Sequence, residues 1–278
     1  MLIFDFLKAI ILGLVEGITE WLPISSTGHM ILFDEFLQLD VSENFMELFL
    51  VVIQLGAIMA VPVLFWNKLN PFSKKDETER RGVWKLWSRV IVGVIPAGVL
   101  GLFLDDILDK YFYNYVVVSI ALIVYGIIFI LIEKYRAERS FEIENVDDIT
   151  YKDALKIGAF QALALIPGTS RSGSTILGGL LFGVSRTASA EFSFFMAIPI
   201  MLAASGLKIL KFILAGFSAT GIEVALLLVG ITVSFVVSLF AIRFLMDFVK
   251  RHNFAPFGIY RIALGTIIVV CFVVESIV

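Results

Sequence analysis

Charged residues and cysteine are both scarce in this sequence of 278 residues. Only 17% of the residues are charged, against about 25% in ordinary soluble domains, and the formal net charge of −3 leaves no basic footprint for nucleic acid. The single cysteine, Cys271, excludes an internal disulfide. Hydrophobic residues make up 59% of the chain, which excludes a disordered chain and exceeds what a soluble domain can bury. We therefore expect an all-α polytopic membrane protein.

Six apolar runs are long enough to cross a bilayer, which takes about 20 residues. Inside lipid such runs must be helical, because a helix satisfies its own backbone hydrogen bonds. Three of them contain a proline, which membrane helices tolerate. The six predicted transmembrane helices cover residues 48–66, 86–104, 115–132, 191–207, 222–242 and 257–274.

Two further apolar segments are interrupted by loops rich in proline, glycine and serine. Residues 6–39 are broken at 23–29, and residues 153–184 are broken at 167–173. Each arm is short for a full crossing, and irregular backbone at membrane depth is tolerated only where protein or water covers it. We therefore predict two re-entrant helical hairpins.

The two predicted hairpins resemble each other. Three spans follow each hairpin, so the second hairpin must enter the membrane from the side opposite to the first. We expect one integral membrane domain, residues 1–278, with an inverted-topology repeat whose halves, about 1–132 and 153–278, are joined by a cytoplasmic loop, 133–152. Transporters build binding sites where such repeats meet, so the architecture fits a carrier as well as an enzyme. A shift of 145 positions aligns Gly13 with Gly158, Glu16 with Gln161, Ser25 with Ser170, Thr27 with Ser172, and Gly28 with Gly173.

Lysine and arginine gather in the predicted loops 67–85, 133–152 and 243–254, which the topology places on one side. Basic loops mark the cytoplasmic side of a membrane protein. We therefore predict that both termini lie outside and that the first hairpin opens outward. The alternative is that these loops bind lipid headgroups or a partner.

Two carboxylates, Glu16 and Glu20, lie four residues apart, so a helix places them on one face. Carboxylates within a membrane usually face a cavity and mark function. Like charges this close repel each other, and a divalent cation between them relieves the repulsion. Oxygen ligands suit Mg²⁺ or Ca²⁺ better than zinc, so we predict a metal site at this pair. The alternative is an interfacial pair that meets water.

His29 is one of two histidines and directly follows a Ser-Ser-Thr-Gly loop that contains Ser26. Histidine titrates near pH 7 and can act as a general acid or base. Beside Glu16 and Glu20, we interpret His29 as a functional residue. The alternative is a loop histidine that only hydrogen-bonds the backbone.

Arg171 lies in the second loop, within Ser-Arg-Ser-Gly and far in sequence from any charged loop. Its planar guanidinium fits two phosphate oxygens at once, and the helix that begins near Ser174 offers free N–H groups to an anion. A plain ion pair with Glu16 or Glu20 is the alternative. The surrounding hydroxyl groups favour phosphate; they belong to Ser170, Ser172, Ser174 and Thr175.

Together the two loops predict phosphoryl transfer, which needs charge neutralisation, a positioned nucleophile and a proton acceptor. Placement at membrane depth indicates a lipid phosphate as substrate. A lipid carrier or flippase is the alternative from another class, but a carrier needs no paired carboxylates with a histidine and a metal.

Two long segments resemble the signatures of a known family. Residues 16–29, EGITEWLPISSTGH, and residues 167–173, PGTSRSG, are similar to the two signatures of the undecaprenyl-diphosphatases, the bacterial bacitracin-resistance proteins. The likeness covers nearly the whole chain and is weakest at 67–85. It also includes residues 52–56, 183–186, 190–194 and 259–261.

The resemblance implies hydrolysis of undecaprenyl diphosphate to undecaprenyl phosphate and inorganic phosphate. This reaction recycles the lipid carrier of peptidoglycan and other envelope polymers, and it confers resistance to bacitracin, which sequesters the diphosphate. The resemblance also implies a divalent cation, Mg²⁺ or Ca²⁺, and a site at the outer face of the cytoplasmic membrane. It implies the core residues Glu16, Glu20, Ser26, His29 and Arg171, with Ser170, Ser172, Thr175 and Thr27 as supporting phosphate ligands.

The sequence fits two nucleophiles. Either Ser26 attacks phosphorus with His29 as the base, or a water molecule does. The oligomeric state also stays open, because the small residues on these helices can pack within one chain or between two copies in a homodimer.

Overall fold

The computed structural model describes residues 2–73 and 76–275 of the chain. Within these ranges the regular secondary structure is helical, apart from one isolated β-bridge between Ile143 and Val184. Three short 3-10 turns cover Pro71–Ser73, Val146–Asp148 and Leu163–Leu165. The α-helices are α1 (Leu2–Thr19), α2 (Ser26–Phe36), α3 (Glu43–Leu64), α4 (Trp66–Leu69), α5 (Glu77–Phe112), α6 (Tyr115–Arg136), α7 (Tyr151–Ala162), α8 (Arg171–Leu181), α9 (Arg186–Leu214), α10 (Gly221–Val249) and α11 (Ala255–Glu275).

Six of these helices are long and apolar enough to cross a membrane, namely α3, α5, α6, α9, α10 and α11. They confirm the prediction of an all-α protein with six spans. Polar N-caps define several of their starts: the side chains of Asn114 and Ser185 accept backbone N–H groups in the first turns of α6 and α9. α9 therefore begins five residues before the predicted apolar run.

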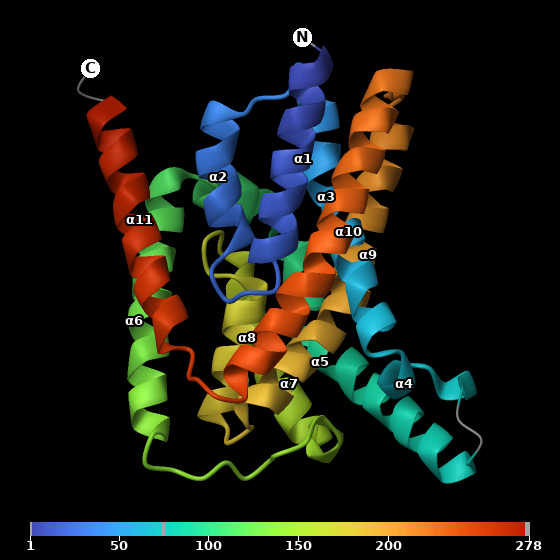
Figure 1. Ribbon diagram of the computed structural model, residues 1–278, viewed down its shortest axis with the longest axis vertical. Coiled ribbons are helices and arrows are strands. Elements are labelled where there is room, and N and C mark those ends of the chain that lie inside the picture. The colour runs from blue at the N-terminus through green and yellow to red at the C-terminus, as the bar shows by residue number, and fades with distance from the viewer. Residues whose placement is uncertain (1, 74–75, 276–278) are drawn as a thin grey trace.

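The chain ends and the basic loops lie at opposite ends of the helical bundle (Figure 1). Both termini are at the upper end, whereas the connections from α3 to α5, from α6 to α7 and from α10 to α11 are at the lower end. Three predicted loops are partly helical. α5 begins at Glu77, inside the predicted loop 67–85, and α10 ends at Val249, inside the predicted loop 243–254. α6 likewise continues through residues 133–136, which we expected in a loop. The carboxylate of Glu133 is buried there and binds Arg186 at 2.5 Å and the Phe254 N–H at 2.8 Å.

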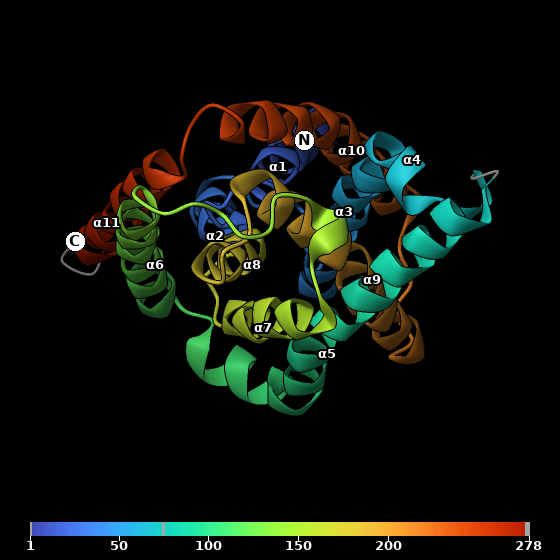
Figure 2. The ribbon, with the colours of Figure 1, turned by 90° about the horizontal axis from the view of Figure 1, so that it is seen from below.

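Two helix pairs, α1–α2 and α7–α8, correspond to the predicted hairpins. α1 and α2 come from the upper end and α7 and α8 from the lower end, so their connecting loops meet inside the bundle (Figure 1). Figure 2 shows α2 and α8 in the middle, with the long helices around them. Their re-entry into a bilayer stays a prediction.

The first helix of each pair packs closely on a long helix from the other half of the chain. A Cβ atom on Gly13 of α1 would lie 2.8 Å from the Gly230 carbonyl oxygen of α10. A Cβ atom on Gly158 of α7 would likewise overlap the Gly93 carbonyl of α5. Gly13 and Gly158 are one of the aligned pairs, so the aligned positions serve the same packing purpose in both pairs.

Candidate active site

The two loops share an unusual backbone conformation. Ser25 has φ 72° and Ser170 has φ 71°, and in the described part of the chain they are the only non-glycine residues with positive φ. Each is the N-cap of the following helix, and its hydroxyl accepts the N–H of Gly28 or Gly173. Such backbone costs about 1–3 kcal/mol and clusters at functional sites. The sequence shift of 145 aligns these same two serines.

The paired carboxylates lie where the helical spacing predicts. The Glu20 N–H donates to the Glu16 carbonyl oxygen at 3.0 Å, so one helical turn continues past the end of α1 and both side chains share a face. Glu16 is 1% exposed, and its Oε1 atom is buried without a hydrogen-bond partner. Glu20 is also buried. An unpartnered carboxylate oxygen within protein is unfavourable, so Glu16 has capacity for a cation.

Arg171 of the second loop contacts Glu20 of the first. Its Nε and Nη2 atoms both donate to Glu20 Oε1 at 3.2 Å, and Nη1 donates to the Ser193 carbonyl oxygen at 2.9 Å. The guanidinium also lies 5.9 Å from the Trp21 ring. The two predicted loops therefore do come together. The ion pair weighed as an alternative to phosphate binding is present, and the phosphate contact stays a prediction.

Ser26 lies beside the same carboxylate, since its Oγ donates to Glu20 Oε2 at 3.0 Å. Glu20 therefore joins the hydroxyl of one loop to the guanidinium of the other. A carboxylate that accepts a hydroxyl hydrogen bond is placed to take that proton during a reaction.

His29 has other partners. Its Nδ1 is 2.7 Å from the Ser25 carbonyl oxygen, and its Nε2 is 2.7 Å from the Tyr260 hydroxyl. A carbonyl oxygen only accepts, so Nδ1 carries the hydrogen, and in the neutral ring Nε2 accepts the Tyr260 O–H. Both nitrogens are thus engaged away from Ser26. The arrangement favours Glu20 over the predicted His29 as the partner that accepts the Ser26 proton.

The hydroxyl groups predicted as phosphate ligands mostly hold the loops together. Ser172 is buried and donates to the Glu20 and Leu22 carbonyl oxygens at 3.0 and 3.3 Å. Thr175 is fully buried and donates to Ser193 Oγ at 2.6 Å. Ser170 caps α8, and its Oγ lies 3.2 Å from that of Ser172. Thr27 lies in the first turn of α2, partly buried.

Three residues around the loops were missing from the predicted site. Ser193 of α9 contacts both Arg171 and Thr175, Tyr260 of α11 contacts His29, and Arg261 of α11 donates to the Pro23 and Gly168 carbonyl oxygens. All three lie in the shorter segments that carry the family resemblance, residues 190–194 and 259–261. The family resemblance of these two segments could have pointed to the three residues, but it did not indicate what each of them does.

The donor set at the loops fits a hard cation. Among residues 2–73 and 76–275, no three His, Cys, Asp or Glu side chains form a group that could hold a metal ion. The two candidates are Glu16, with its unpartnered oxygen, and Glu20. Mg²⁺ characteristically binds one or two carboxylates and takes further oxygen ligands from substrate phosphates.

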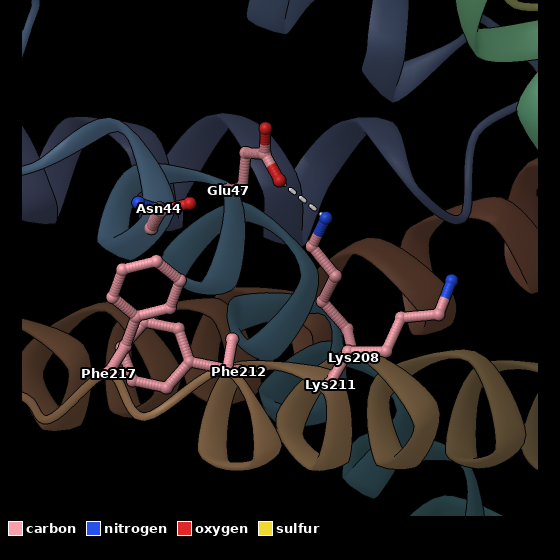
Figure 3. A pocket seen from close by; sticks show the side chains of 7 residues that line it. Asn44, Glu47, Lys208, Lys211, Phe212 and Phe217 are labelled. Atoms are coloured by element: carbon pink, nitrogen blue, oxygen red, sulfur yellow. Dashed lines mark hydrogen bonds and ion pairs between the residues drawn. The ribbon is translucent and has the colours of Figure 1, made fainter.

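A separate pocket near one end of α3 and α9 shares no residue with the loops (Figure 3). An ion pair between Glu47 and Lys208, with a 2.5 Å N···O distance, crosses it. Its lining residues are Asn44, Glu47, Lys208, Lys211, Phe212, Ala215 and Phe217.

Comparisons with known proteins cover both loops. The model of the family described as "Bacitracin resistance protein BacA" matches residues 9–267. A protein of Enterococcus faecalis (strain ATCC 700802 / V583) is 57% identical over 270 residues, which are 97% of this chain and 98% of that relative. A relative from Desulfitobacterium hafniense is 53% identical over 280 residues, the full length of both chains. Both relatives carry the name undecaprenyl-diphosphatase.

Proposed function

Because this chain belongs to the bacitracin resistance protein BacA family, we propose that it hydrolyses undecaprenyl diphosphate to undecaprenyl phosphate and inorganic phosphate. The chain is a multi-pass membrane enzyme, a phosphatase. One observation supports placing the active site at the two loops. Glu20 and Ser26 of the first loop and Arg171 of the distant second loop are joined by hydrogen bonds. The product is the lipid carrier of envelope polymers, so the enzyme recycles that carrier for peptidoglycan synthesis and confers bacitracin resistance.

The terminal phosphate of the substrate binds where the loops meet. Arg171 is the first residue of α8, beside the positive end of that helix, and its guanidinium already binds a carboxylate oxygen. Phosphate oxygens present the same geometry to the guanidinium as a carboxylate does. The bilayer accommodates the apolar tail of the substrate, which needs no polar contact.

Glu16 and Glu20 hold a divalent cation, Mg²⁺ or Ca²⁺. The unpartnered Oε1 atom of Glu16 supports this assignment, because a cation would supply the partner that it lacks. When bound, the cation neutralises charge on the diphosphate, which favours attack by a nucleophile.

Glu20 accepts the proton in the chemical step. Either the Ser26 hydroxyl or a water molecule attacks the terminal phosphorus, and the bond to undecaprenyl phosphate breaks, so that undecaprenyl phosphate leaves. If Ser26 attacks, its proton passes along the existing hydrogen bond to Glu20, and water then hydrolyses the phosphoserine. Arg171 stabilises the charge that develops on the transferred phosphoryl group.

The site opens toward the outer face of the cytoplasmic membrane. Three basic connections lie together at the end of the bundle opposite both termini (Figure 1). Basic loops favour the cytoplasmic side, which puts both termini outside.

Phosphate release by the purified protein in detergent tests the proposed function. No compartment exists in detergent, so a carrier or flippase cannot generate a signal, whereas a phosphatase releases inorganic phosphate from undecaprenyl diphosphate. We expect release that depends on Mg²⁺ or Ca²⁺ and stops with a chelator. A variant of the separate pocket, Lys208→Met, is the control and should keep its rate. No phosphate release from any polyprenyl diphosphate would refute the proposal.

A further inference from the structure

Arg261 of α11 connects the two loops through their backbones. Its Nη2 donates to the Gly168 carbonyl oxygen at 2.9 Å, and its Nη1 donates to the Pro23 carbonyl oxygen at 3.3 Å. These carbonyl groups belong to different loops, 93 and 238 residues away from the arginine in sequence. Arg261 is fully buried, so water does not compete for either contact.

The surroundings of Arg261 contain no opposite charge. In the part of the chain that the structure describes, no carboxylate lies within ion-pair distance of it. Its guanidinium instead lies 5.8 Å from the Tyr125 ring and 6.0 Å from the Phe129 ring. Its Nε atom is buried without a partner. With no carboxylate to pair with, the polar contacts of Arg261 in the described part of the chain are its hydrogen bonds to the two loop backbones.

The two carbonyl groups that Arg261 binds are close in sequence to the chemical groups of the site. Pro23 comes three residues after Glu20 and three before Ser26, and Gly168 comes three before Arg171. Gly168 has φ 89°, a conformation that favours glycine, so its carbonyl direction belongs to a specific loop shape. Holding both carbonyl groups on one rigid fork therefore sets the position of one loop relative to the other.

We propose that Arg261 is a positioning residue for the phosphatase reaction: its guanidinium joins the two loops and holds Arg171 of one against Glu20 and Ser26 of the other. The inference rests on the proposed function. Arg261 does not touch the substrate, and it acts through the geometry of the groups that do. A displacement of about 1 Å between reacting groups can lower a rate about 100-fold.

Arg261→Lys and Arg261→Met test this role. Lysine keeps the charge but loses the planar fork, and methionine loses both. We measure kcat and KM for undecaprenyl diphosphate and the melting temperature of each purified variant. We expect kcat to fall about 100-fold in Arg261→Lys, with KM within about threefold of the unaltered protein, because Arg171 and the lipid tail still bind. The melting temperature of Arg261→Lys should change little.

Arg136 supplies a matched control. It is also buried and donates to two backbone carbonyl groups, those of Leu180 and Leu181 at 2.6 and 2.7 Å, but at the opposite end of α8 from Arg171. Arg136→Met should lower the melting temperature and leave kcat per folded molecule unchanged.

Three other results would contradict the proposal, and kcat, KM and the melting temperature distinguish them. A raised KM with unchanged kcat in Arg261→Lys would make Arg261 a substrate contact. Unchanged kcat with a lower melting temperature, or failure of both variants to fold, would make its role purely structural. No phosphate release by the unaltered protein would refute the proposed function itself, and with it any role of Arg261 in that reaction.

Discussion

At the scale of single residues, Glu20 links the chemistry of the two loops. It accepts hydrogen bonds from Ser26 on one oxygen and from Arg171 on the other, whereas Glu16 next to it has an unpartnered oxygen. The two carboxylates of the proposed cation site therefore differ: Glu20 also accepts hydrogen bonds from both loops, whereas Glu16 has an oxygen without a partner.

Glu16→Gln should weaken the dependence on metal specifically. Glutamine keeps the size of the side chain but removes the charge that binds a hard cation. We expect the Mg²⁺ concentration for half-maximal phosphate release to rise at least about tenfold, as losses in metal sites typically do. Glu191→Gln is the control, because Glu191 is also buried but pairs with Lys68, which belongs to neither loop. Equal metal dependence in both variants would exclude Glu16 as a ligand.

Tyr260→Phe should show whether the Tyr260 hydroxyl orients His29, one of the implied core residues. Phenylalanine keeps the ring that stacks on His29 at 5.6 Å but loses the hydroxyl that donates to Nε2. One hydrogen bond contributes about 1 kcal/mol, so we expect kcat to fall roughly fivefold, with no further loss when the same change is added to His29→Ala. Tyr115→Phe, which stacks on Phe272, is the control. If Tyr260→Phe keeps full kcat while His29→Ala is inactive, Tyr260 does not orient the histidine.

At the scale of elements, each loop ends in a serine that combines strained backbone with a helix cap. Ser170→Gly relieves the strain, because glycine adopts φ 71° readily, and glycine caps a helix only a few tenths of a kcal/mol less well than serine. Ser170→Ala keeps the strain and loses the cap. We expect alanine to lower the free energy of unfolding by about 1 kcal/mol and glycine to change it little. Thermal unfolding of both purified variants measures this difference in stability. If Ser170→Gly is destabilised as much as Ser170→Ala, the backbone at residue 170 is not strained.

The helices and loops were predictable from sequence because they follow from local properties. Long apolar runs become spans, and the Pro-Ile-Ser-Ser and Pro-Gly-Thr-Ser stretches interrupt helices wherever they occur. The contacts of Tyr260 and Arg261 were not predictable. They depend on how α11 packs against loops that are 93 or more residues away in sequence. Neither apolar periodicity nor residue type predicts which distant segments a helix will contact.

Buried charge also escaped prediction where the partner is remote. We placed Glu133 in a cytoplasmic loop because the predicted apolar span ends at Ile132. In the structure, Arg186 donates three hydrogen bonds to the Glu133 carboxylate, two from Nε and one from Nη2. That pairing extends α6. For Ser26 as the nucleophile, the sequence offered His29 as the base; in the fold, His29 Nε2 contacts the Tyr260 hydroxyl and Ser26 Oγ contacts Glu20.

At the scale of the whole molecule, the basic loops and the two termini occupy opposite ends, so labelling can test the orientation. In a Cys271→Ser background, Ser218→Cys lies in the exposed connection from α9 to α10, and Ser140→Cys lies in the exposed connection from α6 to α7. We expect a membrane-impermeant thiol reagent to modify Ser218→Cys in intact cells and Ser140→Cys only after permeabilisation. The reverse pattern would place the termini inside.

The central claim is that two distant loops form one phosphatase site, and a double-mutant cycle on Glu20 and Arg171 tests it most directly. The measurement is the rate of phosphate release from undecaprenyl diphosphate by the unaltered protein, Glu20→Gln, Arg171→Lys and the double variant, each normalised to folded protein. Groups that act as a unit give non-additive losses. We predict a loss of about 10²–10³-fold in each single variant and little further loss in the double variant. Near-normal turnover in Arg171→Lys, or losses that multiply in the double variant, would contradict a shared site.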